Sequence, residues 1–205
     1  MRVADYLFRF AQWVERAGTV GAKSAVAARF RAFGDGSALV FPPGALFGEQ
    51  FIEIGAHTLV GPYVTMSAGL PGEELRTPNG WALRFGNNCS IGRNSFFVSR
   101  VGIDVGDDVT MGPNVYVTDH NHRYDDPTMP VKQQWMSEAP VVIGPGCWLG
   151  AGAVILPGAH LGRNVVVAAG SVVTAGDYPD TSVIAGVPGK VVRHHEAEGW
   201  VKGPL

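Results

Sequence analysis

The chain has 205 residues, of which 46% are apolar and 17% are charged, and its formal net charge is −2. This composition is typical of a globular protein with a sizeable core, and it excludes a disordered chain. The near-neutral charge gives no electrostatic basis for binding nucleic acid. Glycine stands out, with 28 copies. Because glycine weakens ordinary helices and strands, its abundance indicates a fold that needs many tight turns.

The first segment, residues 1–36, is predicted to contain one amphipathic helix. Its apolar residues Val3, Leu7, Phe10 and Val14 recur at helical spacing, and charged residues interrupt it too often for a signal peptide. We expect this helix to pack on the protein or on a neighbouring subunit, with attachment to a membrane surface as the alternative. No apolar run approaches the length of a membrane span, and the expected location is the cytoplasm.

A six-residue period of aliphatic and large apolar residues dominates the rest of the chain. Neither helical periodicity nor simple strand alternation produces this spacing, whereas a unit of one short strand and one turn does. The period is unbroken near the C-terminus and appears in three shorter runs before it. The residues concerned are Ile54, Val60, Met66, Phe85, Ile91, Phe97, Val105, Met111, Val117, Ile143, Leu149, Ile155, Leu161, Val167 and Val173.

The other positions of the unit explain how the chain turns. Three residues after most aliphatic ones comes Asn, Asp or Gly, which tolerate a positive φ, as at Asn88 and Gly152. The following position is small or β-branched and points inward; Cys89 and Cys147 occupy it, so we expect both cysteines to be buried and inert. Three bends close a triangular coil, and stacked coils form an all-β solenoid, a parallel β-helix, over residues 37–193.

Two segments interrupt the period, residues 68–82 and residues 118–140. Long loops in a compact domain are usually functional or disordered, and reactive groups on a rigid scaffold are where function normally lies. The second loop contains two of the six histidines. The helical segment and the tail, residues 194–205, are expected to cover the two open ends of the stack.

At this point the chain resembles a known family. The run from Ile143 to Arg193 is similar to the signature of hexapeptide acetyltransferases, which include galactoside and maltose O-acetyltransferases. The stretch YVTDHNHRYDDP resembles the catalytic-histidine loop of the branch that decorates exopolysaccharide and lipopolysaccharide. The resemblance implies that the β-helix is left-handed, that the protein is a homotrimer with active sites between subunits, that acetyl-CoA is the donor substrate, and that no metal is used.

The resemblance also implies a catalytic base. In the family, the first histidine of the loop deprotonates an acceptor hydroxyl or amine, which then attacks the thioester without a covalent acyl-enzyme. That residue corresponds to His120, and a neutral imidazole with a pKa near 6.5 can accept a proton at physiological pH. Asp119 is expected to orient His120 or to cap the loop. His122 and Tyr124 are candidates for the acceptor side or for support of the site.

Further positions match the family's contacts to acyl-CoA. Trp148 matches a tryptophan beside the thioester and the acceptor. Ala151 stands where a backbone amide faces the thioester oxygen, and such an N–H would stabilise the developing oxyanion. Ala169 and Thr174 match contacts to the pantetheine and the nucleotide.

The basic residues at the C-terminal end complete the expected donor site, with two departures from the family. Lys190 and Arg193 match residues that meet the CoA phosphates, a task suited to a point charge and a fork of donors. Ala175 stands where many relatives have lysine. The asparagine that faces the sugar in the galactoside and maltose enzymes has no clear equivalent in residues 96–102, so their acceptor specificity does not carry over.

Two other functions compete with an O-acyltransferase that modifies a sugar or glycan hydroxyl. A γ-type zinc carbonic anhydrase uses the same fold and needs three imidazoles, for which His120 and His122 could be joined by His57 or His160. A catalytically silent scaffold is the other. Within the acyltransferase class, N-acylation of an amino sugar is also open, and so is the length of the acyl group.

Overall fold

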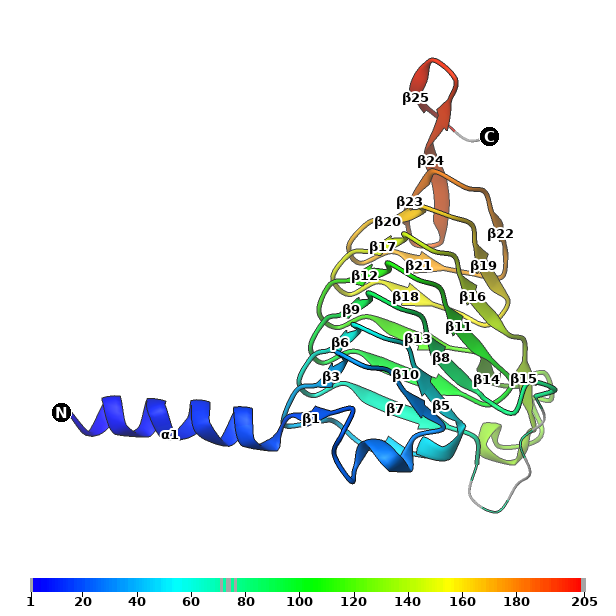
Figure 1. Ribbon diagram of the computed structural model, residues 1–205. Coiled ribbons are helices and arrows are strands. Elements are labelled where there is room, and N and C mark those ends of the chain that lie inside the picture. Colours follow the sequence, from blue (N-terminus) through cyan, green and yellow to red (C-terminus); the bar gives the residue numbers. More distant parts are fainter. Residues whose placement is uncertain (1, 71, 73–74, 76, 204–205) are drawn as a thin grey trace.

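The computed structural model describes residues 2–70, 72, 75 and 77–203. The chain winds upward from its N-terminal part as a stack of triangular coils, and one helix projects from the base of the stack (Figure 1). Three parallel sheets form the three sides of the stack, and each strand pairs with the strands one coil below and one coil above it. The chain is a left-handed β-helix, as the resemblance implies.

Sheet A is the side that carries both ends of the stack. Its lower strands are parallel except for the first pair, and its last strands turn back as antiparallel hairpins. In spatial order it contains β1 (Val20–Gly21), β3 (Ala38–Leu39), β6 (Leu59–Val60), β9 (Ser90–Ile91), β12 (Thr110–Met111), β17 (Trp148–Leu149), β20 (Val166–Val167), β23 (Ser182–Gly186), β24 (Gly189–Glu196) and β25 (Gly199–Lys202).

Sheets B and C form the other two sides. Sheet B contains β2 (Ala32–Phe33), β5 (Ile52–Ile54), β8 (Leu83–Phe85), β11 (Ile103–Val105), β16 (Val141–Ile143), β19 (Ala159–Leu161) and β22 (Gly176–Tyr178). Sheet C contains β4 (Leu46–Phe47), β7 (Thr65–Ala68), β10 (Phe96–Ser99), β13 (Tyr116–Thr118), β18 (Val154–Ile155) and β21 (Val172–Val173). Short helical turns lie at η1 (Ala27–Arg29), η2 (Glu49–Phe51) and η3 (Val131–Gln133).

The six-residue period is the inward face of this coil. Every residue of the predicted period is buried, and together they form one continuous core. The register of the upper coils is eighteen residues, as in the pairing of Val142 with His160. The predicted turn residues have a left-handed backbone, with φ of 56° at Asn88 and 61° at Asn114. The sequence prediction of a parallel β-helix is therefore confirmed.

Glycine directly follows many of the aliphatic residues, and it is needed there for a different reason from the left-handed turn residues. A Cβ at Gly92 would collide with the backbone of Gly112 in the next coil. Gly112 in turn faces the backbone of Ala151, whose amide nitrogen would lie 2.7 Å from a Cβ on this glycine. Coils approach so closely at these corners that only hydrogen fits, so the glycines are needed for stacking.

The two cysteines are buried, as predicted, and each donates its S–H weakly to a backbone carbonyl, Cys147 to that of Gly162 at 3.1 Å. Burial raises the pKa of the Cys147 thiol to about 11. Because the thiolate is the reactive form, we expect Cys147 to resist iodoacetamide in the native protein at neutral pH and to react after denaturation. Mass spectrometry of the labelled chain checks this; rapid native labelling would show that the coil opens there.

The ends of the stack differ in part from the expectation. The helix α1 (Val3–Gly18) projects from the stack and has no buried residue, so it does not cover the first coil (Figure 1). Ala27 and Phe30 are buried at the N-terminal end of the stack instead. Strands β1 and β2 already pair with the coils, so the coiled region begins within segment 1–36. No helix in the described part of the chain is long and apolar enough to cross a bilayer.

Candidate active site

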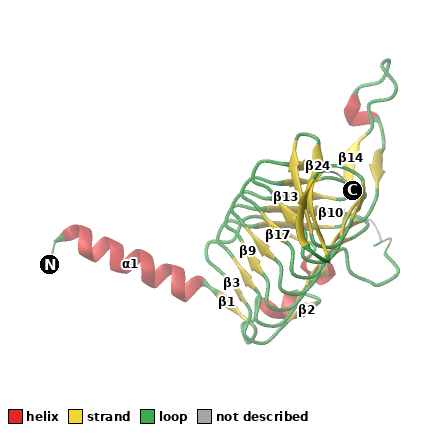
Figure 2. Ribbon diagram, turned by 90° about the horizontal axis from the view of Figure 1, so that it is seen from above, coloured by secondary structure: helices red, strands yellow, loops and turns green. Residues whose placement is uncertain are grey.

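The segment 118–140, expected as a loop, contains a β-hairpin. Strand β14 (His120–His122) pairs antiparallel with β15 (Met136–Glu138), and His120 lies opposite Glu138. The hairpin leaves the stack between β13 and β16 and projects away from it (Figure 2). The sequence predicted only that this segment interrupts the six-residue period; its two short strands follow neither that period nor a recognised turn motif. The hairpin holds His120 at a fixed place on the rigid coil. The other interruption, residues 68–82, includes positions outside the described residues (71, 73–74 and 76).

Asp119 is the most unusual residue of the hairpin base, because its side chain is a carboxylate with no exposed surface. The coil that contains Phe97 is two residues longer than the upper coils, since Phe97 pairs with Val117. The extra residues form a bend whose amides converge on Asp119. Its Oδ2 accepts the N–H groups of Val101 at 2.8 Å and Gly102 at 2.7 Å.

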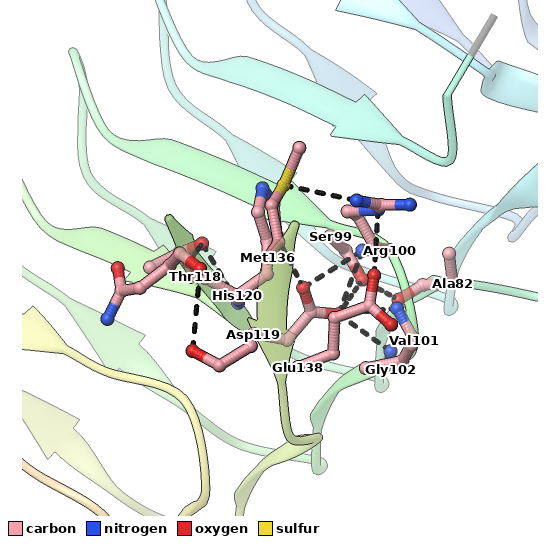
Figure 3. A network of polar contacts seen from close by, with 12 residues as sticks. Ala82, Ser99, Arg100, Val101, Gly102, Thr118, Asp119, His120, Met136 and Glu138 are labelled. Atoms are coloured by element: carbon pink, nitrogen blue, oxygen red, sulfur yellow. Dashed lines mark hydrogen bonds and ion pairs between the residues drawn. The ribbon is translucent and has the colours of Figure 1, made fainter. Parts of the chain in front are cut away.

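Two further donors complete the carboxylate's environment. The N–H of Arg100 lies 2.9 Å from both oxygens, and the Ser99 hydroxyl lies 2.7 Å from Oδ2 (Figure 3). Burial raises the pKa of Asp119, but the hydrogen bonds from His120, Gly102, Ser99 and Val101 outweigh it, so the pKa lies below its ordinary value. Asp119 is therefore ionised at neutral pH.

We expect Asp119→Asn to lower the free energy of unfolding by about 3 kcal/mol at pH 7, because an amide leaves buried N–H donors without an acceptor. A carboxylate with a depressed pKa stabilises the fold above the pKa of the unfolded chain, near 3.9, and loses this effect as pH falls through the folded-state pKa. The difference between wild type and variant should thus shrink below about pH 4. Urea unfolding at several pH values measures it; a difference constant down to the most acidic condition would contradict the ionised state.

His120 is held by this carboxylate. Its Nδ1 lies 2.8 Å from Oδ1 of Asp119, and 14% of its side chain is exposed. Because an ionised carboxylate can only accept a hydrogen bond, Nδ1 carries a proton, and in the neutral ring the lone pair is therefore on Nε2. This contact favours the orienting role for Asp119 that the sequence left open. The pair has the arrangement of a general base with an orienting carboxylate.

Arg100 and Glu138 join the hairpin to the coil, and no motif or spacing in the sequence pointed to either residue. The Arg100 side chain is 4% exposed, and its Nε lies 3.1 Å from Oε1 of Glu138. Its guanidinium also lies over the ring of Trp135, 5.1 Å from the centroid. It contacts the sulfur of Met136 as well (Figure 3). Phe97 and Val105 are eight residues apart instead of six, and these two extra residues were the sequence signal for the bend.

A groove of about 320 Å³ runs beside the hairpin base. One wall is formed by the hairpin, including Asn121 and Ser137, and the other by the coil corners that include Pro157 and Thr174. Thr174 thus lines the same groove as Asn121, the residue that follows His120. Ala175 also lines this groove and is exposed.

The remaining predicted donor residues lie on another part of the coil. Trp148 points outward from β17 in sheet A with 55% of its surface exposed. Ala151 and Ala169 are exposed and stack on the corner between sheets A and C. One strand of sheet C separates this corner from the hairpin, so a single chain does not bring Trp148 and Ala151 to His120.

The last four predicted residues lie on two separate elements, the strand β24 and the hairpin. Lys190 and Arg193 are exposed on β24, and Arg193 lies over the ring of Trp200, 5.5 Å from its centroid. His122 and Tyr124 are exposed on the hairpin. Neither has a contact that gives it a role, so both remain predictions.

The described residues contain no group of three or more His, Cys, Asp or Glu side chains close enough to hold a metal ion. His160 is on β19 and pairs with Asp177 at 3.1 Å, while His57 is a turn residue with φ of 55°. The zinc alternative therefore finds no donor set within one chain.

Coil, period and histidine hairpin together define a class of protein. The chain belongs to the hexapeptide-repeat family of acyltransferases. Family models match two stretches: the hexapeptide repeat of succinyl-transferase matches residues 83–119, and the bacterial transferase hexapeptide matches residues 140–175.

Named relatives are acetyltransferases. A probable acetyltransferase of Mycobacterium tuberculosis is 38% identical over 56% of this chain, and a putative lipopolysaccharide biosynthesis O-acetyl transferase of Escherichia coli is 35% identical over 58%. The chain covers 38% and 64% of their lengths, respectively. The galactoside O-acetyltransferase of Escherichia coli is 32% identical over 73% of this chain and 66% of its own.

Solved structures share the fold. AntD, an N-acyltransferase from Bacillus cereus, superposes with a TM-score of 0.69 over 91% of this chain and 90% of its own, at 17% identity. A hexapeptide-repeat acetyltransferase of Vibrio cholerae in complex with acetyl-CoA gives a TM-score of 0.52 over 84% of this chain and 79% of its own, at 22% identity.

Proposed function

We propose that the protein is an acetyl-CoA-dependent O-acetyltransferase that acts on a hydroxyl of a sugar or glycan, with His120 as the general base. The observation that carries the proposal is the contact of His120 Nδ1 with the buried Asp119, which leaves Nε2 as the proton acceptor. The relatives named galactoside and lipopolysaccharide O-acetyltransferases support the acceptor class.

The chemistry needs one base and no covalent intermediate. Nε2 of His120 takes the proton of the acceptor hydroxyl while its oxygen attacks the thioester carbonyl. The tetrahedral intermediate collapses, the carbon–sulfur bond breaks, and the imidazolium returns the proton to the CoA sulfur. Asp119 stabilises the imidazolium between these steps, because its negative charge lies against Nδ1.

The active site is proposed to form between the subunits of a homotrimer. A closed ring of identical chains needs two different contact surfaces on each chain. The outward column of sheet B is charged, with Glu53, Arg84 and Asp104 in register. The outward columns of the parallel coil strands in sheets A and C are uncharged and include exposed Trp148 on A and the aromatic pair Phe96 and Tyr116 on C.

Packing of sheet C of one chain against sheet A of the next would have a catalytic consequence. The hairpin with His120 borders sheet C, and Trp148 lies on sheet A. The ring would therefore bring Trp148 and the Ala151 amide of one subunit toward His120 of its neighbour. Such a ring would account for their separation within a single chain.

We expect Tyr116→Lys to reduce the mass in solution from that of a trimer to that of a monomer, because it places a charge in an apolar contact. Val142→Lys introduces the same charge on the outward side of sheet B, where it faces Asp104, and should leave the trimer intact. Light scattering on both variants measures the mass. Equal behaviour of the two variants would contradict the choice of sides.

The acceptor assay tests the function. Release of free CoA thiol is followed with acetyl-CoA and a panel of sugars, nucleotide sugars and amines. We expect turnover with hydroxyl acceptors, and an O-acetyl product that is lost in mild base. N-acylation is the second candidate, since AntD is described in complex with dTDP-4-amino-4,6-dideoxyglucose. Turnover only with amino sugars would establish it in place of the O-transferase.

The same preparation tests the zinc alternative. An acyltransferase of the proposed kind should turn over after treatment with a chelator and dialysis. Stoichiometric zinc together with bicarbonate dehydration would overturn the proposal in favour of a carbonic anhydrase.

A further inference from the structure

The helix α1 carries a large apolar surface that the rest of the chain does not cover. It projects from the base of the stack in both views (Figures 1 and 2). On a helical projection all of its large apolar residues except Phe8 lie on one half of the surface; we call this half the apolar face of α1. It consists of Val3, Tyr6, Leu7, Phe10, Trp13 and Val14. All of these except the half-buried Val14 are between 54% and 77% exposed.

The distribution of aromatic and basic residues along α1 is not that of a core helix. Tyr6 and Trp13 lie at one edge of the apolar face, and Phe10 stacks on Trp13 with centroids 6.0 Å apart. Arg9 and Arg16 follow directly beyond this edge on the polar half. An apolar face with Trp, Phe and Leu, bordered by arginines, is the pattern of helices that lie in the interface of a bilayer.

The charges of the chain are unevenly distributed, with a basic N-terminal part and an acidic remainder. Residues 1–23 contain four basic and two acidic residues, whereas residues 24–205 contain twelve basic and sixteen acidic ones. The basic part is therefore the helix and its connection to the first coil. An anionic lipid surface attracts this part and repels the acidic body.

From these observations we propose that α1 binds the surface of a membrane that contains anionic lipids. The helix lies in the interface with its apolar face toward the acyl chains, and Arg9 and Arg16 face the lipid phosphates. Its sixteen residues span about 24 Å. The β-helix is held beside the membrane, where its active site can meet acceptors attached to lipid. The helix alone is the membrane-binding element, so the inference does not depend on the proposed chemistry.

Flotation of the full-length protein with vesicles tests the proposal. Vesicles of phosphatidylcholine alone are compared with vesicles that also contain phosphatidylglycerol. We expect binding to the anionic vesicles that weakens as salt is added, and weaker binding to the neutral ones. Absence of the wild type from the floated fraction with anionic vesicles would overturn the proposal.

Two variants with the same change of charge separate insertion from simple attraction. Leu7→Glu places a carboxylate in the apolar face, and Gln12→Glu places one on the polar half. We expect Leu7→Glu to weaken vesicle binding at least about tenfold more than Gln12→Glu, because it also removes a leucine side chain that inserts among the acyl chains. Equal losses would show that only charge is recognised, without insertion of the face.

The alternative occupant of the apolar face is a second copy of the chain, and the mass in solution distinguishes it. If α1 binds lipid, Leu7→Glu and wild type have the same mass by light scattering. A smaller mass for Leu7→Glu, with no vesicle binding by the wild type, would assign the face to an interface between subunits. Thiol release from acetyl-CoA is measured in parallel, so loss of membrane binding is not confused with loss of activity.

Discussion

Replacement of His120 by alanine is expected to lower kcat about 10²–10⁴-fold, the contribution typical of a positioned general base. The KM for acetyl-CoA should change little, because the imidazole is assigned to the acceptor hydroxyl and not to the donor. Steady-state thiol release with wild type and variant measures both constants. Because the substitution also removes one hydrogen bond of the buried Asp119 carboxylate, thermal unfolding of both proteins is measured in parallel, and kcat is compared below the onset of unfolding of the variant.

His160→Ala is the matched control for this variant. His160 also has a carboxylate partner at its Nδ1, Asp177 at 3.1 Å, but it is exposed on the outward side of sheet B. We expect wild-type turnover. If His120→Ala kept the turnover of the wild type, another group would be the base. A large loss in His160→Ala together with bound zinc would instead favour the carbonic anhydrase.

Ile143→Lys is expected to destabilise the protein by at least about 4 kcal/mol, enough to prevent folding of the affected coils. The side chain of Ile143 is 1% exposed in the interior of the stack, where an ammonium group finds neither water nor a partner. Each coil contacts only its neighbours, so the loss should spread from β16 to the coils on either side. Chemical unfolding and native-state hydrogen exchange measure the size and the spread.

The adjacent residue of the same strand supplies the control. Val142 is 39% exposed and points outward from sheet B opposite Asp104, so Val142→Lys should change stability by less than about 1 kcal/mol. The two variants differ only in the face of the strand that carries the new charge. Similar melting of both would mean that the inward assignment of Ile143 is wrong.

The periodic part of the protein could be predicted because each six-residue unit contains the residues that specify its strand and its turn. Aliphatic residues such as Leu149 and Ile155 define the inward face, and residues such as Asn88 define a left-handed bend. These are local preferences, repeated often enough that no long-range information is needed. The inward small position also predicted correctly that Cys147 is buried.

The hairpin could not be predicted in the same way, because its pairing and its attachment are non-local. His120 was selected through resemblance, but its partner depends on a bend twenty residues earlier, where three backbone amides converge on Asp119. Backbone N–H groups leave no trace in the sequence. Arg100 was overlooked for a similar reason, since its value comes from contacts with Glu138 and Trp135 across the hairpin.

The sequence by itself determined the β-helix and its inward residues, because these follow from local periodicity, and the resemblance of one motif made His120 the proposed base. Only the tertiary structure decided the orientation of His120, the distance of Trp148 and Ala151 from it, and the exposure of α1. The physical reason is the same in each case. Hydrogen bonds to backbone groups, the stacking of distant coils and the position of α1 relative to the coils depend on which segments meet in space, and the order of residues along the chain does not specify that.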